Sequence, residues 1–167
     1  IDPLTGLANR NAFEEMVRAA LSAPSAQPMA LAYLDLDHFK LINDTASHVA
    51  GDAVIRGVAG VIEAHRHRDD LLARTGGDEF LVICPDADLH EALACAERVR
   101  RAVEGRPFEA GLLRLKGTVS VGVAERRPET ADAADLIKQA DQGTCLAKQR
   151  GRNRVVTHQV LAKAATS

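Results

Sequence analysis

The chain has 167 residues, of which 46% are apolar and 26% charged, so it is long enough for one globular domain with a sizeable core. A net charge of −2 and only four Phe and one Tyr argue against a nucleic-acid duplex or an anionic membrane surface as partner. Three widely spaced cysteines are typical of a reducing compartment, and we find no signal peptide and no apolar run near the ~20 residues of a membrane span. We therefore expect a cytoplasmic domain, excised from a longer protein that could carry a membrane anchor upstream of Ile1.

The hydrophobic pattern predicts alternating helices and strands. In chain order we expect an irregular segment at 2–7 and then a helix that is capped by Asn9 or Asn11 and ends near Leu21. Next we expect a buried strand at 29–36, a short helix at 38–44, a longer helix from 49, and a hairpin with strands at 71–73 and 80–84. The last expected elements are a helix at 89–103, strands at 112–116 and 118–124, a helix at 134–148, and a short closing strand at 155–156. This order indicates an α+β fold, ferredoxin-like or polymerase-palm-like, with a central, mainly antiparallel sheet flanked by helices. The domain is predicted to span 1–156, followed by an unanchored tail at 157–167.

The hairpin carries the first candidate for chemistry. Gly76 and Gly77 predict a tight turn, because glycine reaches φ > 0 without steric cost. Asp78 and Glu79 follow, and strand alternation would aim them to opposite sides. Taken alone, this stretch favours a solvated turn without a catalytic role.

A second carboxylate, Asp35, ends the first buried strand, next to where the hairpin would lie. Mg²⁺ takes oxygen ligands, usually one or two carboxylates plus substrate phosphates. Asp35, Asp78 and a backbone carbonyl such as that of Leu36 meet this requirement, and the bland alternative is a pair of solvated strand-end acids.

Cationic and amide side chains lie where a nucleotide would need them. Lys40 opens the short helix after Asp37, and Lys148 and Arg152 follow at the end of the last helix, where they could equally complement its dipole. Asn43 and Asp52 are of the types that pair with guanine.

Five ordered blocks carry a resemblance: DPLTGL, LDLDHFKLINDTxxHxxGD, RTGGDEF, TVSVGVA and AKQRGRNRV. Over Asp2 to Val156 the chain resembles the GGDEF domain of diguanylate cyclases. The resemblance implies synthesis of cyclic di-GMP and pyrophosphate from two GTP molecules, one on each domain of an antiparallel homodimer driven by an upstream sensor or coiled coil.

The resemblance also implies roles for individual residues. It places Mg²⁺, or alternatively Mn²⁺, on Asp35, the Leu36 carbonyl and Asp78. Asp78 would also help to deprotonate the attacking 3′-OH. The nucleotide would be held by the remaining positions: Lys40 at the developing charge, Lys148 and Arg152 at the β/γ phosphates, Asn43 and Asp52 at guanine, His48 near the nucleoside, and Phe39 in the same site. Asp37 and Glu79 are expected to be structural.

Three departures from the family pattern bear on activity. Ala46-Ser47 stands where Tyr-Gly is usual, so we expect strain at Ser47 if that backbone needs φ > 0. Gly143-Thr144-Cys145 replaces Ala-Leu-Tyr, which removes apolar contact beneath Lys148. His67 replaces the arginine of the Arg-x-x-Asp product site, and Arg66-x-x-Asp69 is one position out of register, so product inhibition is expected to be weak.

Three hypotheses therefore remain: an active cyclase, a degenerate domain that binds GTP or a partner protein without turnover, and another palm-like nucleotidyltransferase.

Overall fold

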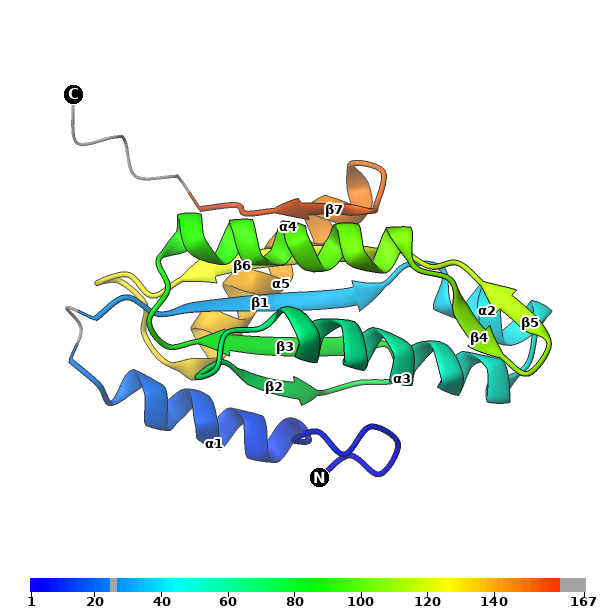
Figure 1. The fold of residues 1–167 in the computed structure, drawn as a ribbon. Helices are drawn as coiled ribbons and strands as arrows, with labels where there is room; N and C mark the ends of the chain where they lie inside the picture. Colours follow the sequence, from blue (N-terminus) through cyan, green and yellow to red (C-terminus); the bar gives the residue numbers. More distant parts are fainter. Residues whose placement is uncertain (25–26, 160–167) are drawn as a thin grey trace.

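The computed structural model describes residues 1–24 and 27–159, and it has the expected α+β architecture (Figure 1). Its elements are α1 (Arg10–Leu21), β1 (Ala30–Leu36), α2 (Phe39–Thr45), α3 (His48–His65), β2 (Leu71–Arg74), β3 (Glu79–Cys84), α4 (Leu89–Gly105), β4 (Phe108–Ala110), β5 (Leu113–Leu115), β6 (Val119–Glu125), α5 (Ala133–Gln149) and β7 (Arg154–Val156). Within the described residues no helix has the length and apolar character needed to cross a membrane.

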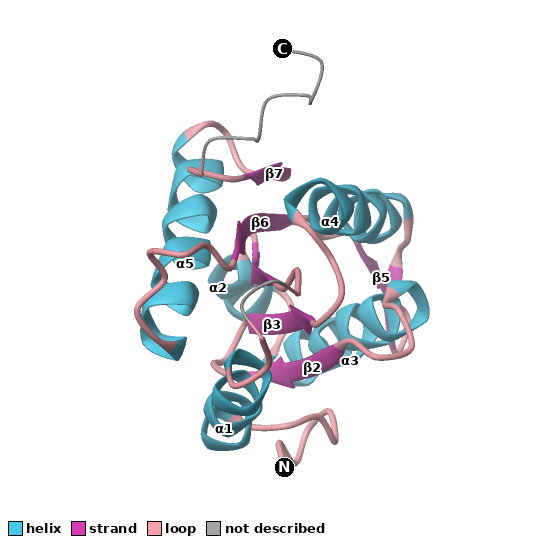
Figure 2. Cartoon of the chain, turned by 90° about the vertical axis from the view of Figure 1, so that its left-hand side faces the viewer, coloured by secondary structure: helices cyan, strands magenta, loops and turns pink. Residues whose placement is uncertain are grey.

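The five-stranded sheet has the order β2-β3-β1-β6-β7. β1 pairs antiparallel with β3 and β6, and only β7 runs parallel to its neighbour. Helices cover both faces, α3 and α4 on one and α1 and α5 on the other (Figures 1 and 2). Because side chains alternate along a strand, Leu31, Tyr33 and Asp35 share one face of β1. Leu31 packs into the cluster that contains α1 and α5 residues, so Asp35 also faces α5.

Helix starts follow the expected chemistry, in which a polar side chain accepts from a free backbone N–H. The side chain of Asn9 accepts from Ala12 N at 3.0 Å, and Asp88 and Asp132 cap α4 and α5 in the same way. Ser47 caps α3 by accepting from Ala50 N at 3.0 Å. Its φ of 174° is extended backbone, so the strain expected at this serine is absent.

The segment after α4 differs from the prediction. The expected strand at 112–116 is shorter and pairs with β4, which the sequence did not predict, in a separate two-stranded sheet. Phe108 of β4 anchors this hairpin because its ring lies over Gly57 of α3, where a Cβ would fall 2.3 Å from it. The hairpin therefore packs on α3 outside the main sheet.

The tail also begins differently. The Gln159 side chain accepts from Glu125 N at 2.7 Å and donates to Glu125 O at 3.0 Å, so the first residues after β7 are anchored to β6. The rest of the predicted tail, 160–167, lies outside the described residues.

α5 lies unusually close to β6, which explains the Gly143-Thr144-Cys145 departure. A Cβ on Gly122 would fall 2.0 Å from the Ala140 carbonyl, and one on Gly143 would fall 2.9 Å from Gly122 Cα. At this distance the Thr144 hydroxyl donates to the Tyr33 carbonyl at 2.8 Å. A buried hydrogen bond to β1 thus replaces the apolar contact whose loss the sequence suggested.

Candidate active site at the glycine turn

Asp35 and Lys148 meet at the end of β1. The carboxylate of Asp35, 9% exposed, accepts a hydrogen bond from the Lys148 ammonium through Oδ2. Its other oxygen, Oδ1, is buried and has no hydrogen-bond partner. A buried carboxylate oxygen without a donor is uncommon in a folded protein, so this atom marks a place where an electropositive ligand fits.

Asp78 sits beside this pair because the turn closes onto β1. The Leu36 N–H donates to the Asp78 carbonyl at 3.0 Å, and Thr75 N donates to Glu79 O at 3.1 Å. In an antiparallel ladder the N–H and C=O of one residue point to the same side. The Leu36 carbonyl therefore faces the hairpin, next to Asp78.

The turn owes its glycines to space and not to a special backbone conformation. Neither Gly76 nor Gly77 has a positive φ, so the expectation of a turn that needs φ > 0 is wrong. Instead the Glu79 side chain folds over Gly76, where a Cβ would fall 2.6 Å from Glu79 Oε2. Glu79 thus packs against the turn that presents Asp78.

Arg74 braces the turn from behind. Its Nη2 and Nε donate to the Gly77 carbonyl at 2.8 and 3.3 Å, and its Nη1 pairs with Asp2 at 3.1 Å. Both side chains of the ion pair are largely buried, at 15% and 14% exposed. Asp2 also accepts from Thr5 N and Oγ1, so the N-terminal loop and the glycine turn form one connected unit.

The electrostatics of the site favour a cation. The pKa of Asp35 is raised to about 6, mainly by burial and also by the neighbouring Asp78 charge, while the Lys148 hydrogen bond opposes both. Burial lowers the pKa of Lys148, but the hydrogen bond and charge of Asp35 with the charge of Asp78 outweigh it, so the net shift is upward. Asp35 thus pairs with the Lys148 ammonium, and the Asp78 charge acts on both groups.

The donor set suits a hard divalent ion. The described residues contain no cluster of three or more His, Cys, Asp or Glu side chains placed to hold a metal. Mg²⁺ needs only one or two carboxylates when substrate phosphates supply further oxygens. Asp35, Asp78 and the Leu36 carbonyl supply three oxygens, and the partnerless Oδ1 is among them.

Asp37 has a structural role, as expected. It is 4% exposed, and its carboxylate accepts from Thr118 Oγ1 at 2.7 Å, Ser120 Oγ at 2.6 Å and Asn153 N at 3.0 Å. Three donors from β6, the segment before it and the loop after α5 thus hold this carboxylate in place.

Comparison with known proteins decides the family. The family model of the diguanylate cyclase GGDEF domain matches residues 1–154. The chain belongs to the GGDEF domain family.

Curated relatives and solved structures agree with this assignment. The probable diguanylate cyclase DgcT of Escherichia coli is 37% identical over 164 residues, covering 96% of this chain and 36% of that protein. The response regulator PleD of Caulobacter vibrioides is 40% identical over 161 residues, covering 93% and 35%. The chain thus spans about a third of these relatives. The crystal structure of the GGDEF domain of DgcB from Caulobacter crescentus in complex with c-di-GMP superposes with a TM-score of 0.88 at 37% identity, covering 93% of this chain and 90% of that one.

The remaining predicted residues of this GGDEF domain surround α2 and the start of α3. Lys40 is exposed in the first turn of α2, and Phe39 is half-buried against the core. Asn43 lies against Gly51, and its buried Oδ1 has no hydrogen-bond partner. His48 begins α3 and Asp52 follows one turn later, both exposed. No hydrogen bond or ion pair between described residues joins this group to Asp35 or Asp78.

Arg152 lies just beyond α5, exposed, in a left-handed backbone conformation with φ of 65°. Its backbone N–H donates to the Ala147 carbonyl at 2.9 Å. It therefore lies one turn beyond Lys148.

In the segment 67–70, Asp70 is buried, whereas His67, Arg68 and Asp69 are exposed. Asp70 is 5% exposed, accepts from His67 N at 2.9 Å, and has a pKa raised by burial. Arg66 Nη1 donates to the Asp70 carbonyl at 2.8 Å and its Nε donates to Glu63. The Arg66 backbone N–H donates to the Ile62 carbonyl at 2.9 Å, so Arg66 is also the C-cap of α3.

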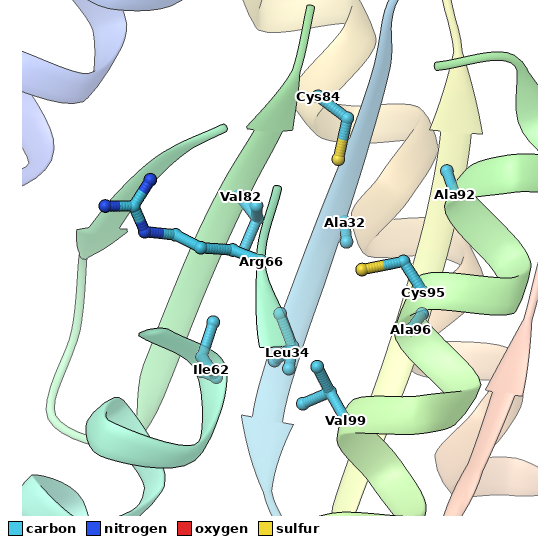
Figure 3. A pocket seen from close by; sticks show the side chains of 10 residues that line it. All are labelled: Ala32, Leu34, Ile62, Arg66, Val82, Cys84, Ala92, Cys95, Ala96 and Val99. Atoms are coloured by element: carbon cyan, nitrogen blue, oxygen red, sulfur yellow. The ribbon is translucent and has the colours of Figure 1, made fainter. Parts of the chain in front are cut away.

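An apolar cavity lies on the other side of the sheet and takes no part in this site. Figure 3 shows the thiols of Cys84 and Cys95 directed into the space between the sheet and α4, with the Arg66 side chain beside it. Apart from these, its lining is aliphatic. The face of β1 that carries Asp35 is the opposite one, so this apolar cavity and the candidate chemistry are separate.

Sequence reasoning missed the residues that hold the site in place. Arg74 and Asp2 belong to two motif blocks, and only their distance in the fold shows that they form one ion pair. Asn153 follows Arg152 in the last block, and its link to Asp37 was not anticipated. The available signal was that Asp2, Arg74 and Asn153 are polar residues within motifs and had no assigned role.

Proposed function

We propose that this GGDEF domain condenses two GTP molecules into cyclic di-GMP and two pyrophosphates, with one GTP on each of two domains and Mg²⁺ as cofactor. The observation that carries the proposal is the convergence of Asp35 and Asp78 at the glycine turn, where a buried carboxylate oxygen lacks a partner. A lone acidic turn would not need a second, buried carboxylate paired with a lysine beside it.

The reaction is two phosphoryl transfers. In each, the 3′-oxygen of one GTP forms a bond to the α-phosphorus of the other, the bond from that phosphorus to the bridging oxygen breaks, and pyrophosphate leaves. The hydroxyl proton is released each time. Such reactions depend mainly on positioning and on charge stabilisation.

The residues of this chain would divide that work by position. Asp35, Asp78 and the Leu36 carbonyl would hold Mg²⁺, which neutralises phosphate charge and orients the phosphates. Asp78, at the turn tip, would also accept the 3′-hydroxyl proton. Lys148 would leave Asp35 and bind phosphate oxygens instead, because the bound metal ion would then neutralise the Asp35 carboxylate.

The nucleotide's other contacts would come from the α2 and α3 region. Lys40 and Arg152 are exposed cations without an ion pair among the described residues, which leaves them available to phosphate oxygens. Asn43 has a partnerless Oδ1, and Asp52 is exposed one turn into α3, so these two offer an amide and a carboxylate to guanine. Phe39 and His48 would border the nucleoside.

Two structural reasons for a degenerate domain are removed by the fold. Ser47 is an unstrained cap, and Thr144 hydrogen-bonds β1 where an apolar contact was expected. The active reading is therefore favoured over GTP binding without turnover.

The test is a turnover assay with GTP and Mg²⁺, using the domain fused to a dimerising coiled coil because each domain carries half of the reaction centre. Cyclic di-GMP, identified by chromatography and mass spectrometry, is the expected product. Asp78→Ala should abolish it, while Asp86→Ala, an exposed acid at the far end of β3, should not change it. Tight GTP binding without product would indicate the degenerate domain, and a linear or mixed product another nucleotidyltransferase.

A further inference from the structure

Asn153 connects both helical layers at the edge of the sheet. Its backbone N–H donates to Asp37 Oδ2 at 3.0 Å, on the α5 side. Its side-chain oxygen accepts from Arg100 Nη1 at 2.9 Å, and its side-chain nitrogen donates to Glu104, both on α4. β7, which begins at the next residue, runs beside α4 in Figure 1. One residue thus links the loop after α5 to the carboxylate that follows β1 and to α4.

This loop has an unusual backbone. Gly151, Arg152 and Asn153 have φ values of 116°, 65° and 47°, three consecutive residues on the positive side. Glycine adopts this region freely and asparagine tolerates it, but an arginine holds it only when its surroundings fix the chain. Backbone hydrogen bonds from Gly151 and Arg152 to the end of α5, and one from Arg154 Nε to the Arg152 carbonyl, hold part of this loop. The contacts of Asn153 hold its far end.

The residues that Asn153 contacts, Arg100 and Asp37, are themselves held by other hydrogen bonds. Arg100 is 13% exposed, and its Nε and Nη2 donate to Glu97 at 2.9 and 2.7 Å, so its remaining nitrogen is aimed at Asn153. Asp37 is fixed by Thr118 and Ser120. The loop therefore rests between two rigid anchors and not on a mobile surface side chain.

We propose that Asn153 is a positioning residue that acts through Arg152 and sets the affinity of the domain for the triphosphate of its nucleotide. This rests on the proposed function, in which Arg152 contacts the β/γ phosphates. The Arg152 side chain is exposed and has no ion pair among the described residues, so its backbone sets the point from which the guanidinium reaches out. Loss of the Asn153 contacts releases that backbone and spreads the guanidinium over many positions.

A double-mutant cycle tests the link to Arg152. The probe is 3′-deoxy-GTP with Mg²⁺, because this nucleotide lacks the attacking hydroxyl. Calorimetry measures the affinity of each variant for this triphosphate and, for comparison, its affinity for GMP. Asn153→Ala is expected to weaken binding of the triphosphate about tenfold, the scale of one charge-assisted phosphate contact, without changing GMP binding. Asn153→Gly, which keeps the left-handed backbone, should recover part of the loss. In an Arg152→Ala background, Asn153→Ala should add nothing, and an additive loss or an equal loss for GMP would overturn the proposal.

Trypsin cleavage after Arg152 tests, without any nucleotide, whether Asn153 holds the loop in place. Cleavage should be at least about fivefold faster in Asn153→Ala, because local opening exposes the bond. It should be unchanged in Arg101→Ala, a control on the same helix whose side chain is 74% exposed and contacts Glu97 but not Asn153. If Asn153→Ala is cleaved at the wild-type rate, Asn153 does not hold the loop and the proposal is overturned. A wild-type domain that fails to bind 3′-deoxy-GTP refutes the proposed function, and the cleavage result still decides whether Asn153 fixes the loop.

Discussion

Asp35→Asn is expected to stabilise the metal-free domain while removing its activity. The pKa of Asp35 is raised from 3.8 to about 6, mainly by burial. A rise of about two units corresponds to ~3 kcal/mol favouring the neutral form, and partial solvent access reduces this to ~1–3 kcal/mol. Asparagine mimics the neutral carboxyl, so it avoids the cost of ionisation. The Lys148 side chain is 37% exposed, so losing its partner costs little.

The effect has a defined pH dependence. Because the pKa is higher in the folded than in the unfolded chain, the Asp35 contribution to stability is full below about pH 4 and is lost as the pH rises through 6. Asp35→Asn should therefore match the wild type near pH 4 and exceed it at pH 8. Asp86→Asn, an exposed control, should show no such difference.

Urea and thermal unfolding at both pH values measure this prediction. At pH 8 the melting temperature of Asp35→Asn should rise by about 2–4 °C for each kcal/mol in a domain of this size. Mg²⁺ should raise the stability of the wild type, whose ionised site binds it, and should have a smaller effect on Asp35→Asn. A variant less stable than the wild type at pH 8 would refute the account of Asp35 as a destabilised, ligand-ready carboxylate.

Two further predictions concern the surroundings of the site. Cyclic di-GMP should inhibit weakly, because His67 stands where the product site needs an arginine and Arg66 is engaged by backbone carbonyls. The variant His67→Arg should therefore lower the inhibition constant about tenfold. Calorimetry that finds tight product binding in the wild type, lost in Asp70→Ala, would contradict this. Arg74→Ala should cost about 2–3 kcal/mol of stability and slow turnover, since it breaks the Asp2 pair and both bonds to the Gly77 carbonyl. Asp2→Asn keeps the bonds to Gly77 and should have the smaller effect on kcat; equal turnover in Arg74→Ala and the wild type would show that the turn needs no brace.

The sequence predicts elements well where one pattern dominates. The apolar run ending at Leu36 gives β1, and Pro85 and Gly151 limit β3 and α5 near the expected residues. The β4–β5 hairpin was missed because three-residue strands carry too little alternation to be distinguished from a loop. What holds it is the contact of Phe108 with Gly57 of α3, about fifty positions away in the chain, and no local pattern reports that contact.

The candidate site, too, could be predicted from the sequence only in part. Asp35 and Asp78 were predicted to meet because β1 and the hairpin are neighbours. The Leu36 N–H, next to Asp35, donates to the Asp78 carbonyl at 3.0 Å, and a shared metal ion stays a prediction. The reason for Gly76 was wrong, since the glycine accommodates the Glu79 side chain and not a positive φ. The bond between Lys148 and Asp35 also escaped prediction, because it depends on how closely α5 packs on β6 through Gly122 and Gly143.

The central claim is that Asp35 and Asp78 share one divalent ion with the nucleotide. The most direct measurement is the anomalous difference map of crystals grown with Mn²⁺ and 3′-deoxy-GTP. The account predicts a manganese peak within about 2.3 Å of carboxylate oxygens of both residues and of a phosphate oxygen. A bound nucleotide with no peak between these two carboxylates, or with the metal held elsewhere, would contradict it.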